Sequence, residues 1–261
     1  MYGIYWAAVI VTAVAGFVAV VAWRAWDKDR YAFAAFAIGL PLSALVNEYV
    51  KAPLISAIQG VAWPGRAGPA PWGFLLAALW VAPLTEEAVK LLPLTIPGLR
   101  SSLDRPSSAL KYGMGSGFGF GLGEAWYLAW GITHSQAYAR LPFYYFTGYI
   151  SERLVVCFAH GVMTSVAMTG IARGGPAAAG GYLGAAALHA LLNIGALLHQ
   201  ARLAGPYAPS LAMLVSLIVL AAVFERLRFQ AFPAGSAAGR VVWVKKTPGE
   251  AEPPSRKEGE S

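Results

Sequence analysis

Residues 3–23 read GIYWAAVIVTAVAGFVAVVAW, a stretch without a single charged side chain. A helix of this length rises about 30 Å, which is the thickness of the hydrocarbon core of a bilayer. Only helices and closed barrels satisfy their backbone polar groups in lipid. Six further apolar stretches follow, at residues 31–50, 72–96, 109–132, 150–171, 176–199 and 209–224. The pattern therefore predicts an all-α, polytopic transmembrane bundle of about seven spans.

The composition excludes a soluble globular domain. The 261 residues are 57% hydrophobic and 13% charged, whereas soluble domains carry about 25% charged residues. The net charge of +7 comes largely from short loops and the C-terminal region. We interpret it as an orientation signal under the positive-inside rule and not as a nucleic-acid-binding surface.

The basic loops predict the orientation of the spans. With the N-terminus outside and the C-terminus inside the plasma membrane, most basic loop residues face the cytoplasm. These residues are Arg24, Lys28, Arg30, Arg100, Arg105, Lys111, Arg173, Arg226 and Arg228. An eighth crossing near residues 56–62 would change this topology.

The chain divides into one membrane domain and a tail. Residues 1–228 form the predicted transmembrane domain, and the polar motifs described below lie within residues 72–198. Residues 229–261 are predicted to be a disordered cytoplasmic tail, because residues 233–261 mix Pro, Gly, Ser, Lys and Glu and cannot bury a core.

Glycines alternate with larger residues through the fourth stretch. On a helix, Gly113, Gly117 and Gly121 share one face, and Gly115, Gly119 and Gly123 share another. Small residues allow helices in membranes to approach closely. The fourth helix is therefore expected to pack tightly between two neighbours.

Ionisable side chains interrupt the apolar spans. An ionised group in mid-bilayer costs about 2.5–3.5 kcal/mol, so several such groups must face one another or water. Counted from the span ends, the interrupting groups come to similar depths. They are Glu86, Glu87 and Lys90 in the third stretch, Glu124 in the fourth, His160 in the fifth, and His189 with Asn193 in the sixth. They are expected to line one wet cavity built from the third to sixth spans.

This set of side chains is suited to hydrolysis. A carboxylate can take a proton from water, imidazoles can hold a metal or donate a proton, and an amide can stabilise an oxyanion. Two His and one Glu also match a catalytic zinc site with an open position. In a structural alternative, Glu86 and Lys90 form an ion pair between residues i and i+4. Lys51 lies near the outer end of the second span, where snorkelling and local pairing suffice. The same holds for Glu152 beside Arg153, although either of these two residues could touch substrate.

Four runs resemble the motifs of the PrsW family of intramembrane proteases. They are EEAVK at residues 86–90, GFGFGLGE at 117–124, HGVMT at 160–164 and HALLN at 189–193, in similar order and spacing. A more distant similarity connects them to the CAAX-prenyl protease and related bacteriocin-processing membrane proteins. The resemblance covers residues 72–198. In one departure, Ala125 follows Glu124 where the family usually has Asn.

The resemblance implies cleavage of peptide bonds in a single-span membrane protein, in the best-known case an anti-sigma factor. By position, Glu86 would be the water-activating base and Glu87 a second acid, and Asn193 would stabilise the transition state. The implied metal ligands are Glu124, His160 and His189, and the expected ion is zinc. The implied enzyme is thus a PrsW-like metallo or glutamic endopeptidase.

Two other functions fit the same polar residues. A proton- or ion-coupled transporter would use buried Glu and His as a relay, but no matching halves with broken helices are evident. A membrane scaffold without activity would retain the same architecture. Other intramembrane protease classes fit poorly, because the chain has neither an HExxH motif nor a mid-membrane Asp pair.

Overall fold

The computed structural model describes residues 2–66 and 69–233, and within them it contains helices and no strand. The α-helices are α1 (Gly3–Ala25), α2 (Arg30–Val46), α3 (Ala52–Ala62), α4 (Trp72–Val89), α5 (Pro97–Ser101), α6 (Pro106–Thr133), α7 (Thr147–Arg173), α8 (Pro176–Gln200) and α9 (Ala208–Ala231). Shorter turns are the π-helical Asn47–Lys51 and the 3₁₀ segments Pro64–Arg66, Leu92–Thr95 and Phe143–Phe146. The predicted all-α class is confirmed.

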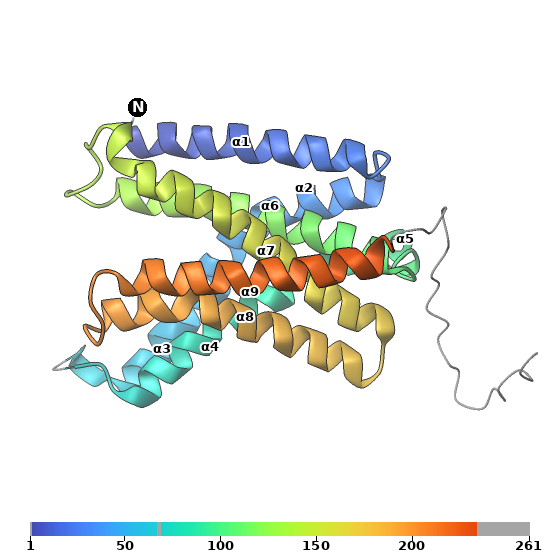
Figure 1. The fold of residues 1–261 in the computed structure, drawn as a ribbon. Helices are drawn as coiled ribbons and strands as arrows, with labels where there is room; N and C mark the ends of the chain where they lie inside the picture. Colours follow the sequence, from blue (N-terminus) through green and yellow to red (C-terminus); the bar gives the residue numbers. More distant parts are fainter. Residues whose placement is uncertain (1, 67–68, 234–261) are drawn as a thin grey trace, which may run out of the picture.

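The long helices run side by side as a bundle (Figure 1). The N-terminus, the segment leading into α7 and the connection from α8 to α9 lie at one end, and α5 and the connection from α7 to α8 lie at the other. Five helical segments are long and apolar enough to cross a membrane: Gly3–Ala25, Arg30–Ala62, Phe143–Arg173, Pro176–Gln200 and Ala208–Ala231. Helices α4 and α6 are not among them, so the count of seven spans and the orientation stay predictions.

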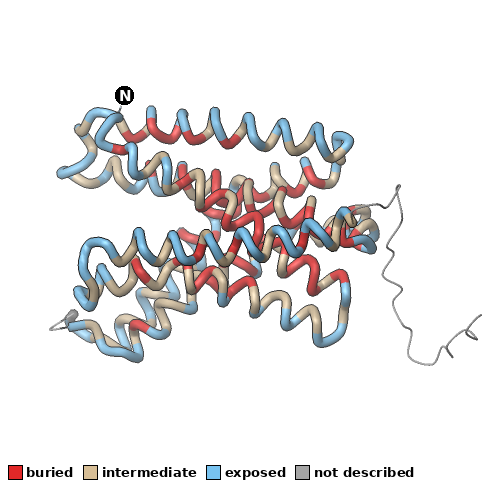
Figure 2. The backbone as a smooth tube through the Cα atoms, in the orientation of Figure 1, coloured by how far each residue is buried: buried red, intermediate tan, exposed pale blue. Residues whose placement is uncertain are grey.

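Helix α6 forms the centre of the bundle, and its two glycine faces have the predicted role. A Cβ at Gly117 would overlap the carbonyl of His160 on α7, and one at Gly119 would overlap the carbonyl of Phe36 on α2. Figure 2 shows buried backbone concentrated in this central region, whereas α1 and α9 are largely exposed. Tight packing of α6 between α2 and α7 therefore sets the position of the polar residues that these helices carry.

The second predicted span is longer than expected. Helices α2 and α3 are joined through the π-helical turn Asn47–Lys51 into a continuous segment, Arg30–Ala62, of 33 residues. At 1.5 Å per residue this segment is about 50 Å long. Residues 56–62, where an eighth crossing was considered, thus extend the same helix. The π turn places Lys51 within a helix rather than at a span end.

The third predicted span is shorter than expected. Residues 72–96 were expected to form one helix, but α4 ends at Val89. Pro93 accounts for this end, because its ring lacks an N–H and clashes with the carbonyl four residues earlier, which is that of Val89. The chain continues through Leu92–Thr95 into α5. Glu86 and Glu87 consequently lie in the last turn of α4.

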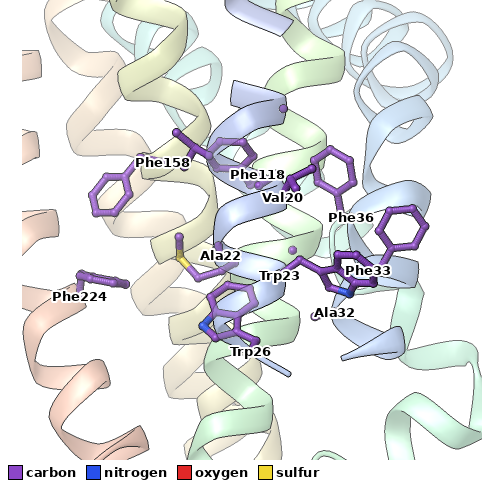
Figure 3. Close-up of a pocket in the computed structure, with 15 residues that line it drawn as sticks. Val20, Ala22, Trp23, Trp26, Ala32, Phe33, Phe36, Phe118, Phe158 and Phe224 are labelled. Atoms are coloured by element: carbon purple, nitrogen blue, oxygen red, sulfur yellow. The ribbon is translucent and has the colours of Figure 1, made fainter. Parts of the chain in front are cut away.

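An apolar cavity of about 440 Å³ opens between α1 and the rest of the bundle (Figure 3). Its aromatic lining residues are Trp23, Trp26, Phe33, Phe36, Phe118, Phe158 and Phe224. It contains no titratable side chain, so the predicted chemistry lies elsewhere.

The C-terminal boundary differs slightly from the expected one. Helix α9 continues to Ala231, three residues beyond the predicted domain end at 228. The predicted disordered tail falls mainly on residues 234–261, which lie outside the described residues.

Candidate metal and catalytic site

Three side chains from three helices meet in the interior. Glu86 of α4, His160 of α7 and His189 of α8 each offer one ligand atom, and these atoms lie within 4.8 Å of one another. All three residues are buried, with 1%, 1% and 3% exposure respectively. Such a group is large enough for one metal ion held by two nitrogens and one oxygen, which is the ligand set of many catalytic zinc sites.

Glu87 orients the imidazole of His189. The Nδ1 atom of His189 lies 2.8 Å from Oε1 of Glu87, and its Nε2 lies 3.7 Å from Oε2 of Glu86. An ionised Glu87 only accepts hydrogen bonds, so Nδ1 carries the proton and Nε2 presents its lone pair. A carboxylate behind a histidine in this way fixes the tautomer and the direction of a metal ligand.

The fit to a metal follows from the unpaired acceptors. Oε2 of Glu86 is buried and has no hydrogen-bond partner, and it faces the lone pair of His189 Nε2. Two acceptors that face each other away from water need a cation or a proton between them. The donor set and its burial therefore fit a divalent ion such as zinc.

His160 lies between a lysine and a carboxylate. Its Nδ1 is 2.6 Å from Nζ of Lys90, and its Nε2 is 3.4 Å from Oε2 of Glu124. The Lys90 ammonium only donates hydrogen bonds, so Nδ1 of His160 accepts from Lys90. The proton of a neutral His160 then lies on Nε2, which donates to Glu124. His160 can therefore bind a metal only by giving up one of these two contacts.

The ion pair of Glu86 with Lys90, considered as a structural alternative, does not form. Lys90, which is fully buried, bonds Oε1 of Glu87 at 2.6 Å, and its Nζ lies 4.5 Å from the centre of the Phe120 ring. Because α4 ends at Val89, Lys90 is the residue after the helix, and its carbonyl accepts a 2.6 Å hydrogen bond from the hydroxyl of Ser116. Lys90 therefore supports Glu87 and His160.

The partner of Glu86 is Lys51, which the sequence analysis placed at a span end. Nζ of Lys51 donates to Oε1 of Glu86 at 2.8 Å. Single-turn π-helical insertions are frequent at functional sites, and this one delivers the lysine to the site. A lysine inside an apolar stretch was the signal that could have identified it.

A cavity of about 580 Å³ reaches the imidazoles. Helices α6, α7, α8 and α9 line it. The cavity was predicted between the third to sixth spans, which correspond to α4, α6, α7 and α8, so α9 takes the place expected for α4. Glu124, Arg153 and Asn193 lie in its wall together with His160 and His189. Gly148, Pro209 and Ser210, from the starts of α7 and α9, also line it, so it extends toward the end of the bundle that holds the N-terminus (Figure 1).

Glu124 lines this cavity and is not part of the candidate metal site formed by Glu86, His160 and His189. Its Oε2 accepts a 2.9 Å hydrogen bond from Nη1 of Arg153 in addition to the 3.4 Å contact with His160. Arg153, which the sequence placed near a span end, is only 8% exposed and lines this cavity.

The structure thus brings all six predicted site residues into one region. Glu86, His160 and His189 form the candidate metal site, and Glu87 contacts the Nδ1 atom of His189. Glu124 and Asn193 line the adjoining cavity.

A search of curated proteins and a search of solved structures found no match to the chain. The family profile described as PrsW family intramembrane metalloprotease matches residues 2–223, which extends well beyond the four motifs. None of these comparisons supports the transporter alternative. The chain, a helical membrane protein with a buried Glu and His cluster, belongs to the PrsW family of intramembrane metalloproteases.

Proposed function

We propose that the chain is a zinc-dependent endopeptidase of the plasma membrane that cleaves a single-span membrane protein, such as an anti-sigma factor. The observation that carries the proposal is the group of Glu86, His160 and His189, whose ligand atoms lie within 4.8 Å of one another beside a polar cavity. Zinc, when bound, supplies Lewis acidity that polarises water or a peptide carbonyl.

The geometry supports an exchange of two roles that the family resemblance implied. Glu86 lies with the imidazoles, has a buried oxygen without a hydrogen-bond partner, and does not line the cavity. Glu124 lines the cavity and stands outside that group. We therefore assign Glu86 to the metal and Glu124 to proton transfer.

Glu124 is positioned to act on water. Its contacts with Arg153 and His160 both involve Oε2, and its side chain lines the cavity and is 14% exposed. As the oxygen of water bonds to the carbonyl carbon, Glu124 takes the proton that the water loses. The same proton passes to the amine nitrogen when the C–N bond breaks, so the carboxylate is regenerated.

The remaining site residues orient the reacting groups. Glu87 and Lys90 fix the two imidazoles through the contacts at their Nδ1 atoms. Asn193 lies four residues after His189 and lines the same cavity, so its amide can donate to the carbonyl oxygen as negative charge develops there. The substrate is expected to enter from the end of the bundle that holds the N-terminus. In the predicted orientation, this end is on the outer side of the membrane.

The test compares membranes from cells that express the parent chain, Glu86→Gln or Glu225→Gln. Glu225 is exposed and bonds Arg228 on α9, which makes it a matched control. New N-termini in membrane proteins are labelled and identified by mass spectrometry. We expect cleavages that occur with the parent and Glu225→Gln and disappear with Glu86→Gln. An equal set of new termini in all three samples would reject the proposed function.

A further inference from the structure

The cavity holds one cation that the proposed chemistry does not yet use, Arg153. Its guanidinium is on α7, two helical turns before His160, so both side chains lie on the same side of the helix. Arg153 is more than nine-tenths buried and lines the cavity together with His160, His189 and Asn193. A buried charge beside these residues is therefore a candidate for a function in the reaction.

The contacts of Arg153 leave donors unused. A guanidinium has five N–H donors. Nη1 donates to Glu124 at 2.9 Å and Nη2 donates to Glu152, whereas the buried Nε has no acceptor. Buried donors are normally paired, so a ligand that enters the cavity with an acceptor atom would complete this set.

The distances place Arg153 close to the reacting groups. Oε2 of Glu124 contacts both Nη1 of Arg153 and Nε2 of His160. Glu124 therefore connects the guanidinium to Nε2 of His160, a residue of the candidate metal site, through two successive contacts. A peptide group bound in the cavity beside Glu124 and His160 would lie within its reach.

The local charge indicates which acceptor binds. Arg153 already contacts two carboxylates, those of Glu124 and Glu152, so a third carboxylate would meet a site with excess negative charge. A neutral carbonyl oxygen carries no such penalty before reaction, and it gains attraction to the cation as it becomes negative in the transition state.

Resting on the proposed function, we propose that Arg153 is a catalytic residue that donates a hydrogen bond to the scissile carbonyl oxygen, beside Asn193. The water oxygen bonds to the carbonyl carbon, the C=O pair moves onto the oxygen that Arg153 contacts, and the oxyanion then collapses as the C–N bond breaks. The proton transfers remain those of Glu124. Arg153 stays protonated throughout, because a guanidinium keeps its proton in proteins.

The test uses the full chain in detergent and a fluorescence-quenched peptide that spans the most abundant cleavage found in the membrane experiment. The variants are Arg153→Lys, Arg153→Ala, and Arg173→Lys as a matched control. Arg173 is at the exposed far end of the same helix, where it bonds Gln230. Each variant is measured for kcat, KM and bound zinc.

Removal of one oxyanion donor lowers kcat by about 10²- to 10³-fold. We expect Arg153→Lys, which retains the charge beside Glu124 but lacks the planar fork, to lose at least about tenfold in kcat. Its KM and zinc content should stay near those of the parent, and Arg173→Lys should match the parent. In Arg153→Ala, added guanidinium ion should restore part of kcat, because a free guanidinium can fill the same space.

Arg153→Lys decides the outcome even where Arg153→Ala does not fold. A parental kcat in Arg153→Lys would overturn the proposal, and so would a joint loss of kcat and zinc, because that pattern indicates a structural role. Folded, zinc-containing Arg153→Ala that guanidinium does not reactivate would also count against it. A parent chain that cleaves no membrane protein would instead reject the proposed function itself.

Discussion

Substitution of Gly121 by Ala tests whether close packing of α6 against α7 positions the site. A Cβ at Gly121 would lie 2.7 Å from Cα of Cys157 and 3.1 Å from Cδ2 of the His160 ring. Carbon atoms pack best at about 3.5–4.0 Å. The two helices must therefore separate by roughly 1 Å next to His160.

The expected loss of activity exceeds the expected loss of stability. Overpacking costs about 1–3 kcal/mol, and Ala gains about 1 kcal/mol over Gly in a helix, so the net destabilisation should be about 0–2 kcal/mol. A misplacement of about 1 Å at a catalytic site can cost about 10²-fold in rate. We expect Gly121→Ala to fold and to cleave roughly 10²-fold more slowly.

The assay measures thermal unfolding in detergent and cleavage of the reporter peptide, with Gly131→Ala as the matched control. Gly131 is on the same helix, and a Cβ there would have no neighbour within 4 Å. The control should retain parental activity and unfold at the same or a slightly higher temperature. Equal activity of Gly121→Ala and the parent would refute the reasoning, as would equal losses in the two variants.

Three further outcomes follow from the site. Glu87→Gln should weaken zinc binding about 10- to 100-fold, because the charged partner of His189 Nδ1 is lost; chelator competition measures this affinity, and unchanged affinity would contradict the assigned role, with Glu225→Gln as control. Ser210→Trp, which projects into the cavity, should lower kcat/KM at least about tenfold without loss of zinc, whereas Leu211→Trp on the exposed face of α9 should not; equal kinetics in the two variants would show that substrate does not use this cavity. Treatment of the parent with a zinc chelator should abolish cleavage, and added zinc should restore it; cleavage that persists in metal-free protein would exclude a metal role.

The sequence predicted those features that depend on periodicity. Apolar length gave the helices, and the spacing of Gly113 to Gly123 gave two packing faces because residues four apart lie on one side of a helix. The cost of placing polar groups in lipid predicted that Glu124, His160 and His189 would converge, because such groups must face one another or water.

The pairing of charges could not be predicted in the same way. The spacing of Glu86 and Lys90 allowed an ion pair between them, but Pro93 ends α4 before that helical turn is complete, and Lys90 turns toward Glu87. Lys51 reaches Glu86 from a π-helical turn, which no local sequence pattern predicts. Such contacts depend on backbone irregularities and on partners distant in sequence.

The most direct test of the central claim is X-ray absorption at the zinc edge of the purified, active chain. We predict one zinc per chain, with two imidazole nitrogens at about 2.0–2.1 Å and carboxylate oxygen at about 2.0–2.2 Å. His189→Ala should lose one nitrogen shell or the metal itself. An active enzyme without stoichiometric metal, or a zinc environment without imidazole, would contradict the account.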